Sequence, residues 1–76
     1  MNDTRHIAQL DVGESAILGE MKLPEEASAR LEEMGFLPGA AIRLVRRAPL
    51  GCPIEFEVAG TRLAIREVDA ANILVG

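Results

Sequence analysis

The single cysteine of this 76-residue sequence is the side chain best suited to act as a nucleophile or a soft metal ligand. Cys52 stands in the segment APLGCP, between Gly51 and Pro53. A thiol becomes reactive when a histidine, a cation or a helix N-terminus stabilises its thiolate, and a zinc site needs several Cys or His ligands. The only histidine, His6, is distant in the sequence. We therefore interpret Cys52 as a turn residue and expect Cys52→Ser to keep the fold and partner binding.

Acidic side chains form a second group that could bind a cation. The glutamates in question are Glu25, Glu26, Glu32 and Glu33, all within one expected helix. Residues placed in this way usually form the solvated side of an amphipathic helix, so we favour that interpretation over a metal site. We expect no cofactor, because the spacing of ligand residues does not support even weak binding of a transition metal. The sequence also has no glycine-rich phosphate loop and no Ser/His/Asp set, which argues against an enzyme.

Five arginines in the second half of the chain form the third group: Arg43, Arg46, Arg47, Arg62 and Arg66. Small barrels that bind single-stranded nucleic acid combine a basic groove with stacking aromatic residues. This chain has no Tyr or Trp, and we assign its two Phe residues to the core. We favour a solvated face on which the arginines pair with glutamates of neighbouring strands. Within a binding role, a protein surface is favoured over nucleic acid.

The composition is that of an ordinary folded domain. Hydrophobic residues make up 49% of the chain and charged residues 26%, which excludes the composition of disordered chains. We expect one domain over residues 1–76, with residues 1–8 forming a flexible N-terminal segment in which His6 is a surface residue. The sequence shows no signal peptide and no membrane-spanning apolar run, so we expect a cytoplasmic protein without membrane insertion.

The net charge of −4 is unevenly distributed along the chain. Residues 1–38 carry three basic and eight acidic side chains, whereas residues 39–76 carry five basic and four acidic ones. A domain that binds nucleic acid is normally strongly basic. The uneven charge therefore favours a protein partner.

One helix is expected in the segment LPEEASARLEEMGFLPG. Pro24 suits its first position, because the N–H that proline lacks has no partner there. Apolar residues spaced by four and three positions form one core-facing stripe: Ala27, Leu31 and Met34. Gly35 supplies the left-handed residue that ends the helix, and Phe36 then packs against Leu31. We therefore expect Phe36 in the core.

Alternating apolar and polar residues predict five short strands, at residues 14–21, 41–47, 53–58, 61–66 and 73–75. The alternation fails at Arg46, as it does where a strand bulges. A two-residue loop at positions 59–60 pairs Phe56 with Leu63 on the core face of a hairpin. The same register pairs Glu57 with Arg62 on its solvent face.

These elements predict a mostly β fold. The expected architecture is a small, partly closed antiparallel barrel of about five strands, with one helix between the first two strands and a short C-terminal helical turn. Closure of such a barrel hides the strand edges that otherwise invite aggregation.

The succession LEEMGFLPGAAIRLVRRAPLGCPIEFEVAGTRLAIREVDAANILV resembles the ferrous iron transport protein A (FeoA) family. The resemblance implies a Src-homology-3-like (SH3-like) barrel and a non-enzymatic accessory role in bacterial ferrous iron uptake, beside the transporter FeoB. The barrel is also similar to the C-terminal domain of some iron-dependent repressors, whose DNA-binding helices this chain lacks. Where family members often have Asp after PLG, this chain has Cys52, so the polar turn contact of that Asp is expected to be lost or weakened.

The leading hypothesis is a protein-interaction module that binds the cytosolic part of a FeoB-type transporter, either its G domain or its membrane domain, and modulates it. The candidate contact residues are Leu37, Pro38, Arg43, Arg46, Arg47 and Leu50. Leu50 is an apolar residue on a predicted loop, and clustered exposed apolar residues mark partner contacts. The alternative is a regulatory barrel that senses a ligand or nucleic acid. The sequence leaves open whether the chain forms a homodimer.

Overall fold

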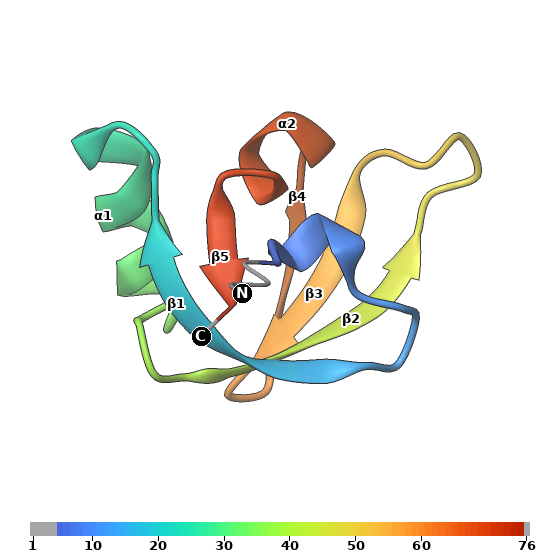
Figure 1. Cartoon of the computed structure of the whole chain (residues 1–76), viewed down its shortest axis with the longest axis horizontal. Coiled ribbons are helices and arrows are strands. Elements are labelled where there is room, and N and C mark those ends of the chain that lie inside the picture. The colour runs from blue at the N-terminus through green and yellow to red at the C-terminus, as the bar shows by residue number, and fades with distance from the viewer. Residues whose placement is uncertain (1–4, 76) are drawn as a thin grey trace.

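A curled antiparallel sheet of five strands forms the body of the protein (Figure 1), seen in a computed structural model that describes residues 5–75. The strands are β1 (Ser15–Met21), β2 (Ala41–Arg47), β3 (Ile54–Val58), β4 (Thr61–Ile65) and β5 (Ile73–Val75), in the sheet order β4-β3-β2-β1-β5. Three helices complete the fold: η1 (Ile7–Gln9), a 3-10 helix, α1 (Glu25–Glu33) and α2 (Glu67–Ala70). The predicted five strands, the helix between the first two and the short C-terminal helix are confirmed.

Apolar residues at alternate strand positions build the core. The buried strand residues are Leu18, Ile42, Leu44, Ile54, Phe56, Val58, Ile65 and Ile73. Phe36, which follows α1, is also fully buried, as predicted. Each large apolar side chain removed from water contributes roughly 1.5–3 kcal/mol. These buried side chains form one core, which lies inside the curl of the sheet (Figure 1).

The hairpin between β3 and β4 has the predicted loop and register. Ala59 and Gly60 both have positive φ, at 52° and 82°, which is the signature of a type I′ turn. Phe56 lies opposite Leu63, and Glu57 lies opposite Arg62. Between β2 and β3 the register shifts after Leu44, so the predicted bulge near Arg46 is also confirmed.

Helix α1 ends as the sequence predicts and starts one residue later. Pro24 is the N-cap, and the first helical residue is Glu25. At the other end Gly35 has φ of 100°, its N–H donates to the Glu32 carbonyl over 3.0 Å, and the Phe36 N–H donates to the Leu31 carbonyl over 2.9 Å. These two bonds define a Schellman motif. It turns the chain from the helix into the core at Phe36.

The sheet does not close into a sealed barrel, because β4 and β5 stand at the two ends of the strand order. The edge of β5 is covered by the N-terminal segment, where His6 bridges to Leu74 and the Val75 N–H donates to the Arg5 carbonyl over 2.9 Å. The edge of β4 has no such cover among the described residues. The expectation that closure hides the strand edges is therefore wrong for β4.

The segment that leads into β1 is packed against the sheet. Ile7 is fully buried and Leu10 nearly so, and η1 contacts both α2 and β5; Figure 1 shows η1 lying across the concave side of the sheet. The expectation of a flexible segment over residues 1–8 is therefore wrong from Arg5 onward, and residues 1–4 lie outside the described part of the chain. Burial of the two apolar side chains explains the difference.

Candidate functional site

The arginines of β2 pair across the sheet with glutamates of β3. Arg43 forms an ion pair with Glu57, and Arg46 Nε lies 3.6 Å from Glu55 Oε1. The Arg46–Glu55 pair is largely exposed and the Arg43–Glu57 pair is partly buried; exposed pairs contribute about 0–1 kcal/mol each. The cross-strand pairing expected from the sequence is confirmed. Arg46 remains the more accessible of the two, with 62% of its side chain exposed.

Arg47 holds the N-terminal segment in place. One guanidinium nitrogen, Nη2, donates to the carbonyls of Ala8 and Leu10 over 2.7 and 3.0 Å. Hydrogen bonds from a charged donor contribute about 1.5–3 kcal/mol each. Arg47, predicted as a partner contact, therefore has a structural role that sequence reasoning missed, because the two carbonyls lie almost forty residues away in the chain.

The remaining predicted contact residues lie at opposite ends of β2. Leu37 and Pro38 are exposed in the turn before the strand, and Leu50 is 96% exposed at the tip of the loop after it. At about 3.3 Å per residue, the seven residues of β2 separate the two ends by roughly 20 Å. Figure 1 shows this separation. The six predicted residues therefore do not form one surface. The turn surface consists of Leu37 and Pro38, and the loop surface of Arg46 and Leu50. Arg43 lies on the strand between them, and Arg47, the last residue of β2, is bound to the N-terminal segment.

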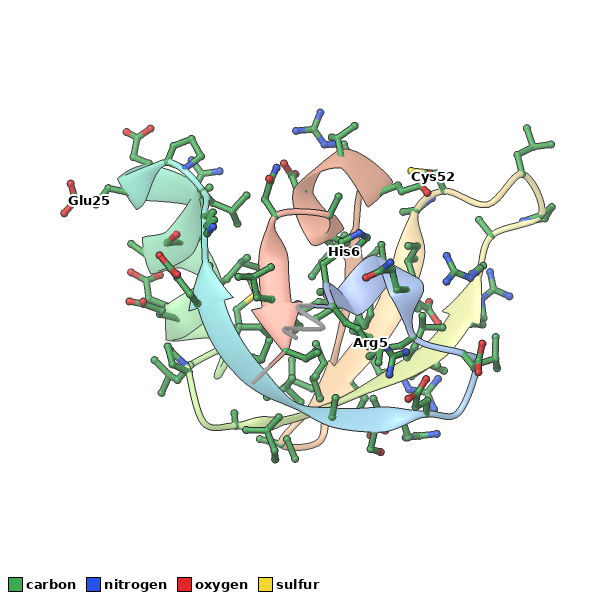
Figure 2. All side chains as sticks on the ribbon, in the orientation of Figure 1. Arg5, His6, Glu25 and Cys52 are labelled. Carbon is green, nitrogen blue, oxygen red and sulfur yellow. The ribbon has the colours of Figure 1, made fainter. Side chains whose placement is uncertain are left out.

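Cys52 lies at the base of the loop after β2, beside α2 (Figure 2). Its Sγ accepts a hydrogen bond from the backbone N–H of Glu67, the first residue of α2, over 3.4 Å. The thiol is exposed, and its described surroundings supply no group of three or more His, Cys, Asp or Glu residues that could hold a metal ion. Cys52 therefore links the loop to α2 through this hydrogen bond.

A second polar cluster fixes the entry to β1. Arg5 donates to both carboxylate oxygens of Glu14 over 3.1 and 3.3 Å, and the Asp11 N–H donates to Glu14 Oε1 over 2.8 Å. The Arg5 side-chain hydrogen bonds and the Asp11 N–H hold the pKa of Glu14 below its ordinary value. Beside this cluster His6 is partly buried, and its Nδ1 is enclosed and has no hydrogen-bond partner among residues 5–75. The expectation of a surface histidine is therefore wrong.

The glutamates of α1 lie on the outside of the molecule. Glu25, Glu26, Glu32 and Glu33 are all exposed, and Figure 2 shows Glu25 pointing away from the sheet. They surround no common point, since residues 5–75 contain no cluster of three or more candidate ligands. Within the same residues, no helix combines the length and the apolar character needed to cross a bilayer.

An apolar groove of about 380 Å³ separates α1 from β4. Its apolar lining residues are Leu23, Ala27, Leu31, Met34, Leu63, Ala64 and Ile65. The apolar stripe predicted on α1 therefore lines an open groove, and Met34 is 48% exposed. Arg30, Arg66 and Asp69 stand at its rim. Sequence reasoning missed this groove, because its width depends on how far α1 stands from the sheet.

Comparison with known proteins identifies the chain at the family level. Residues 5–76 match the family model described as FeoA domain. The chain is 30% identical over 69 residues to a fusion protein of Porphyromonas gingivalis (strain ATCC BAA-308 / W83), described as Fe(2+) transport protein A/Fe(2+) transporter FeoB. That alignment covers 91% of this chain and 8% of the fusion protein, so the chain spans a small part of this relative.

Solved structures give the same fold. The solution structure of the FeoA protein from Chlorobium tepidum superposes with a TM-score of 0.89 at 31% identity, over 92% of this chain and 67% of the other. Stenotrophomonas maltophilia FeoA, solved in complex with zinc and described as a prokaryotic SH3 domain protein, superposes with a TM-score of 0.76 at 28% identity, over 93% and 88% of the two chains. The predicted SH3-like architecture is therefore confirmed, with an open sheet.

Proposed function

The chain belongs to the FeoA domain family of ferrous iron transport, and from this premise we propose that it is a non-enzymatic regulator that binds the cytosolic part of a FeoB-type transporter. The observation that carries this proposal is the fusion relative, in which a domain similar to this chain shares one polypeptide with a FeoB transporter. Linking two modules raises their effective concentration to about the millimolar range for short flexible linkers. When the two modules are on separate chains, they need an interface that binds them together without the linker.

The loop surface is the best-supported contact for such an interface. Leu50 exposes 96% of its surface at the tip of the loop, and no described residue covers it. Arg46 lies at the end of β2 that leads into this loop, with most of its side chain free of protein contact. Arginine is enriched in protein interfaces, and a fully exposed apolar side chain gains stability when a partner covers it. The turn surface, with Leu37 at 48% exposure, is the second candidate.

On this proposal the transporter binds the iron, and the turn and loop surfaces contact only the transporter. The described residues hold no cluster of metal ligands, and their titratable groups surround no cleft with a nucleophile and a base. On this proposal the chain acts on the cytoplasmic side of the membrane through contact alone. It changes the rate of transport by binding one state of the transporter more tightly than another.

Co-purification tests this proposal. A tagged form of the chain is mixed with the detergent-solubilised FeoB-type transporter of the same organism, and the recovered complex is quantified. We expect recovery with the native chain, and a clear reduction with Leu50→Glu. The matched control is Val12→Glu, which places the same charge on another exposed apolar residue. Failure of the native chain to recover the transporter would overturn the proposal.

A further inference from the structure

The outer edge of β4 presents backbone groups that no described residue satisfies. The type I′ turn closes on Val58 and Thr61, which therefore exchange both hydrogen bonds of a narrow pair. Hydrogen-bonded pairs alternate with non-hydrogen-bonded pairs along an antiparallel ladder, so Leu63 also bonds to β3. Arg62 and Ala64 therefore direct their backbone N–H and C=O groups away from β3. Neither has another backbone partner in the described chain. Both residues are exposed, so this edge is open.

The groove beside α1 follows this same edge. A groove over one face of a strand is lined by alternate residues, because successive side chains point to opposite faces. Here four consecutive residues of the β4 region line it, from Leu63 to Arg66. The opposite wall is the apolar stripe of α1. The groove is therefore a slot between an open strand edge and an apolar helix face, and its volume of about 380 Å³ lies within the range of ligand-binding clefts.

Basic side chains outnumber acidic ones along the slot, although Arg66 Nη2 pairs with Asp69 Oδ2 over 3.2 Å at its rim. On its solvent face β4 carries Arg62, followed by Arg66 just beyond the strand, with only Ala64 between them on that face. Arg62 has no ion-pair partner among residues 5–75, since its cross-strand neighbour Glu57 pairs with Arg43. Arg30, on the helix side of the rim, is likewise unpaired in that part of the chain. An acidic ligand finds complementary charge here, although the whole chain is net negative.

We propose that this slot binds an extended acidic and apolar segment of a partner protein, which pairs with β4 as a sixth strand. The segment receives backbone hydrogen bonds from Arg62 and Ala64, as in other cases of strand addition. Opposite Leu63 and Ile65 it carries apolar residues that fill the slot, and opposite Arg62 and Arg66 it carries acidic ones. The recognised pattern is therefore acidic, apolar, any, apolar, acidic, and it is the same in either chain direction.

A second copy of this chain fits the edge poorly. Antiparallel pairing of two β4 strands about Ala64 places Arg62 of each copy opposite Arg66 of the other. Like charges directly opposite each other destabilise a strand pair. The basic face thus disfavours self-pairing of β4 in this register, which is a common use of charge on edge strands. The inference rests on the proposed function only for the identity of the protein that carries the segment.

A synthetic peptide tests the slot without the transporter. The probe is acetyl-Ser-Glu-Val-Thr-Val-Glu-Ser-amide, added to the ¹⁵N-labelled chain and followed by NMR. We expect saturable shifts from Arg62 to Arg66 and at Leu31, and at least tenfold slower amide exchange of Ala64 at saturation. Two control peptides replace either both valines by asparagine or both glutamates by lysine, and we expect each to bind at least tenfold more weakly.

Two variants of the chain identify the contacts. Ala64→Pro removes an N–H that faces solvent, a position where an edge strand tolerates proline, and we expect at least tenfold weaker peptide binding. Arg62→Glu keeps every backbone group, and we expect it to prefer the lysine peptide over the glutamate peptide. The inference is overturned if the native chain shows no saturable shifts, or if it binds the asparagine peptide as tightly as the probe. It is also overturned if Arg62→Glu keeps the charge preference of the native chain, or if the shifts of β4 change on dilution without peptide, as they would for self-association.

The transporter then separates this inference from the proposed function. If the native chain recovers the transporter and Arg62→Glu recovers it equally well, the transporter does not supply the segment and the link between slot and transporter is overturned. If the native chain fails to recover the transporter while the peptide binds as expected, the proposed function is wrong and the slot remains a peptide-binding site. Reduced recovery with Arg62→Glu supports both.

Discussion

The backbone N–H of Glu67 donates a hydrogen bond to Sγ of Cys52 over 3.4 Å, and this bond ties the loop after β2 to the first turn of α2. The resemblance to the FeoA family implies aspartate at this position, and a carboxylate is a stronger acceptor than a thiol for an N–H at a helix start. The bond explains why a polar residue suits this position. Cys52 thus makes a weak polar contact at the position where the resemblance led us to expect the contact of an aspartate to be lost or weakened.

Cys52→Asp should therefore stabilise the protein, because a charge-assisted hydrogen bond replaces a weak bond to sulfur. We expect a gain of about 0.5–1 kcal/mol in the free energy of unfolding, given the exposure of the site. Urea denaturation measures the change. Cys52→Ser keeps an acceptor and should stay within about 0.5 kcal/mol of the native chain. A less stable Cys52→Asp variant would contradict the assigned contact.

Arg47→Ala should detach the N-terminal segment from the sheet. The variant loses both hydrogen bonds from Nη2 and leaves the carbonyls of Ala8 and Leu10 without that donor. We expect a loss of at least about 1.5–3 kcal/mol in the free energy of unfolding, the contribution of one such bond, and faster amide exchange in η1. The matched control is Arg46→Ala, whose exposed pair with Glu55 accounts for less than about 1 kcal/mol. Equal effects of the two variants would refute the structural role of Arg47.

The lowered pKa of Glu14 predicts a specific loss of stability in acid. A carboxyl group whose pKa is depressed in the folded state stabilises the fold above its unfolded pKa, and this stabilisation is lost as the pH falls through the lowered value. Stability contributed by the cluster with Arg5 and Asp11 is therefore complete near neutral pH and declines from about pH 5 downward. Glu14→Gln should flatten this part of the stability profile, whereas Glu20→Gln, at an exposed position, should leave it unchanged.

Gly35→Ala should weaken the end of α1. Glycine has φ of 100° here, a conformation that strains any residue with a Cβ atom. The added Cβ would lie 3.7 Å from Val58 Cγ1, an ordinary contact, so the expected cost of about 1–2 kcal/mol is conformational. Thermal unfolding detects it as a lower Tm. An unchanged Tm would show that the end of α1 adopts another conformation.

Local sequence signals predict most of the fold. Alternation within residues 54–65 and the glycine at position 60 specify a hairpin by contacts between near neighbours, and the register from Phe56 to Leu63 follows directly. Gly35 and Phe36 specify the end of α1 in the same way. These features depend on residues a few positions apart, where the chemistry of turns and the period of the strand leave few choices.

Features that depend on distant parts of the chain could not be predicted in this way. Ile7 and Leu10 are buried in a segment whose carbonyls, at Ala8 and Leu10, accept hydrogen bonds from Arg47, almost forty residues later in the chain. The slot beside β4 depends on the distance between α1 and the sheet, which the stripe ending at Met34 does not specify. A stripe of three apolar residues is compatible with a buried helix face or with one wall of a groove. Only the three-dimensional arrangement distinguishes them.

The direct measurement is the affinity of this chain for the FeoB-type transporter of its own organism, reconstituted in nanodiscs and followed by biolayer interferometry. The proposed function predicts saturable binding that Leu50→Glu weakens at least tenfold, while Val12→Glu, with the same change of charge at another exposed residue, binds as the native chain does. Equal loss in both variants would contradict the loop surface. No saturable binding of the native chain would contradict the proposed function itself.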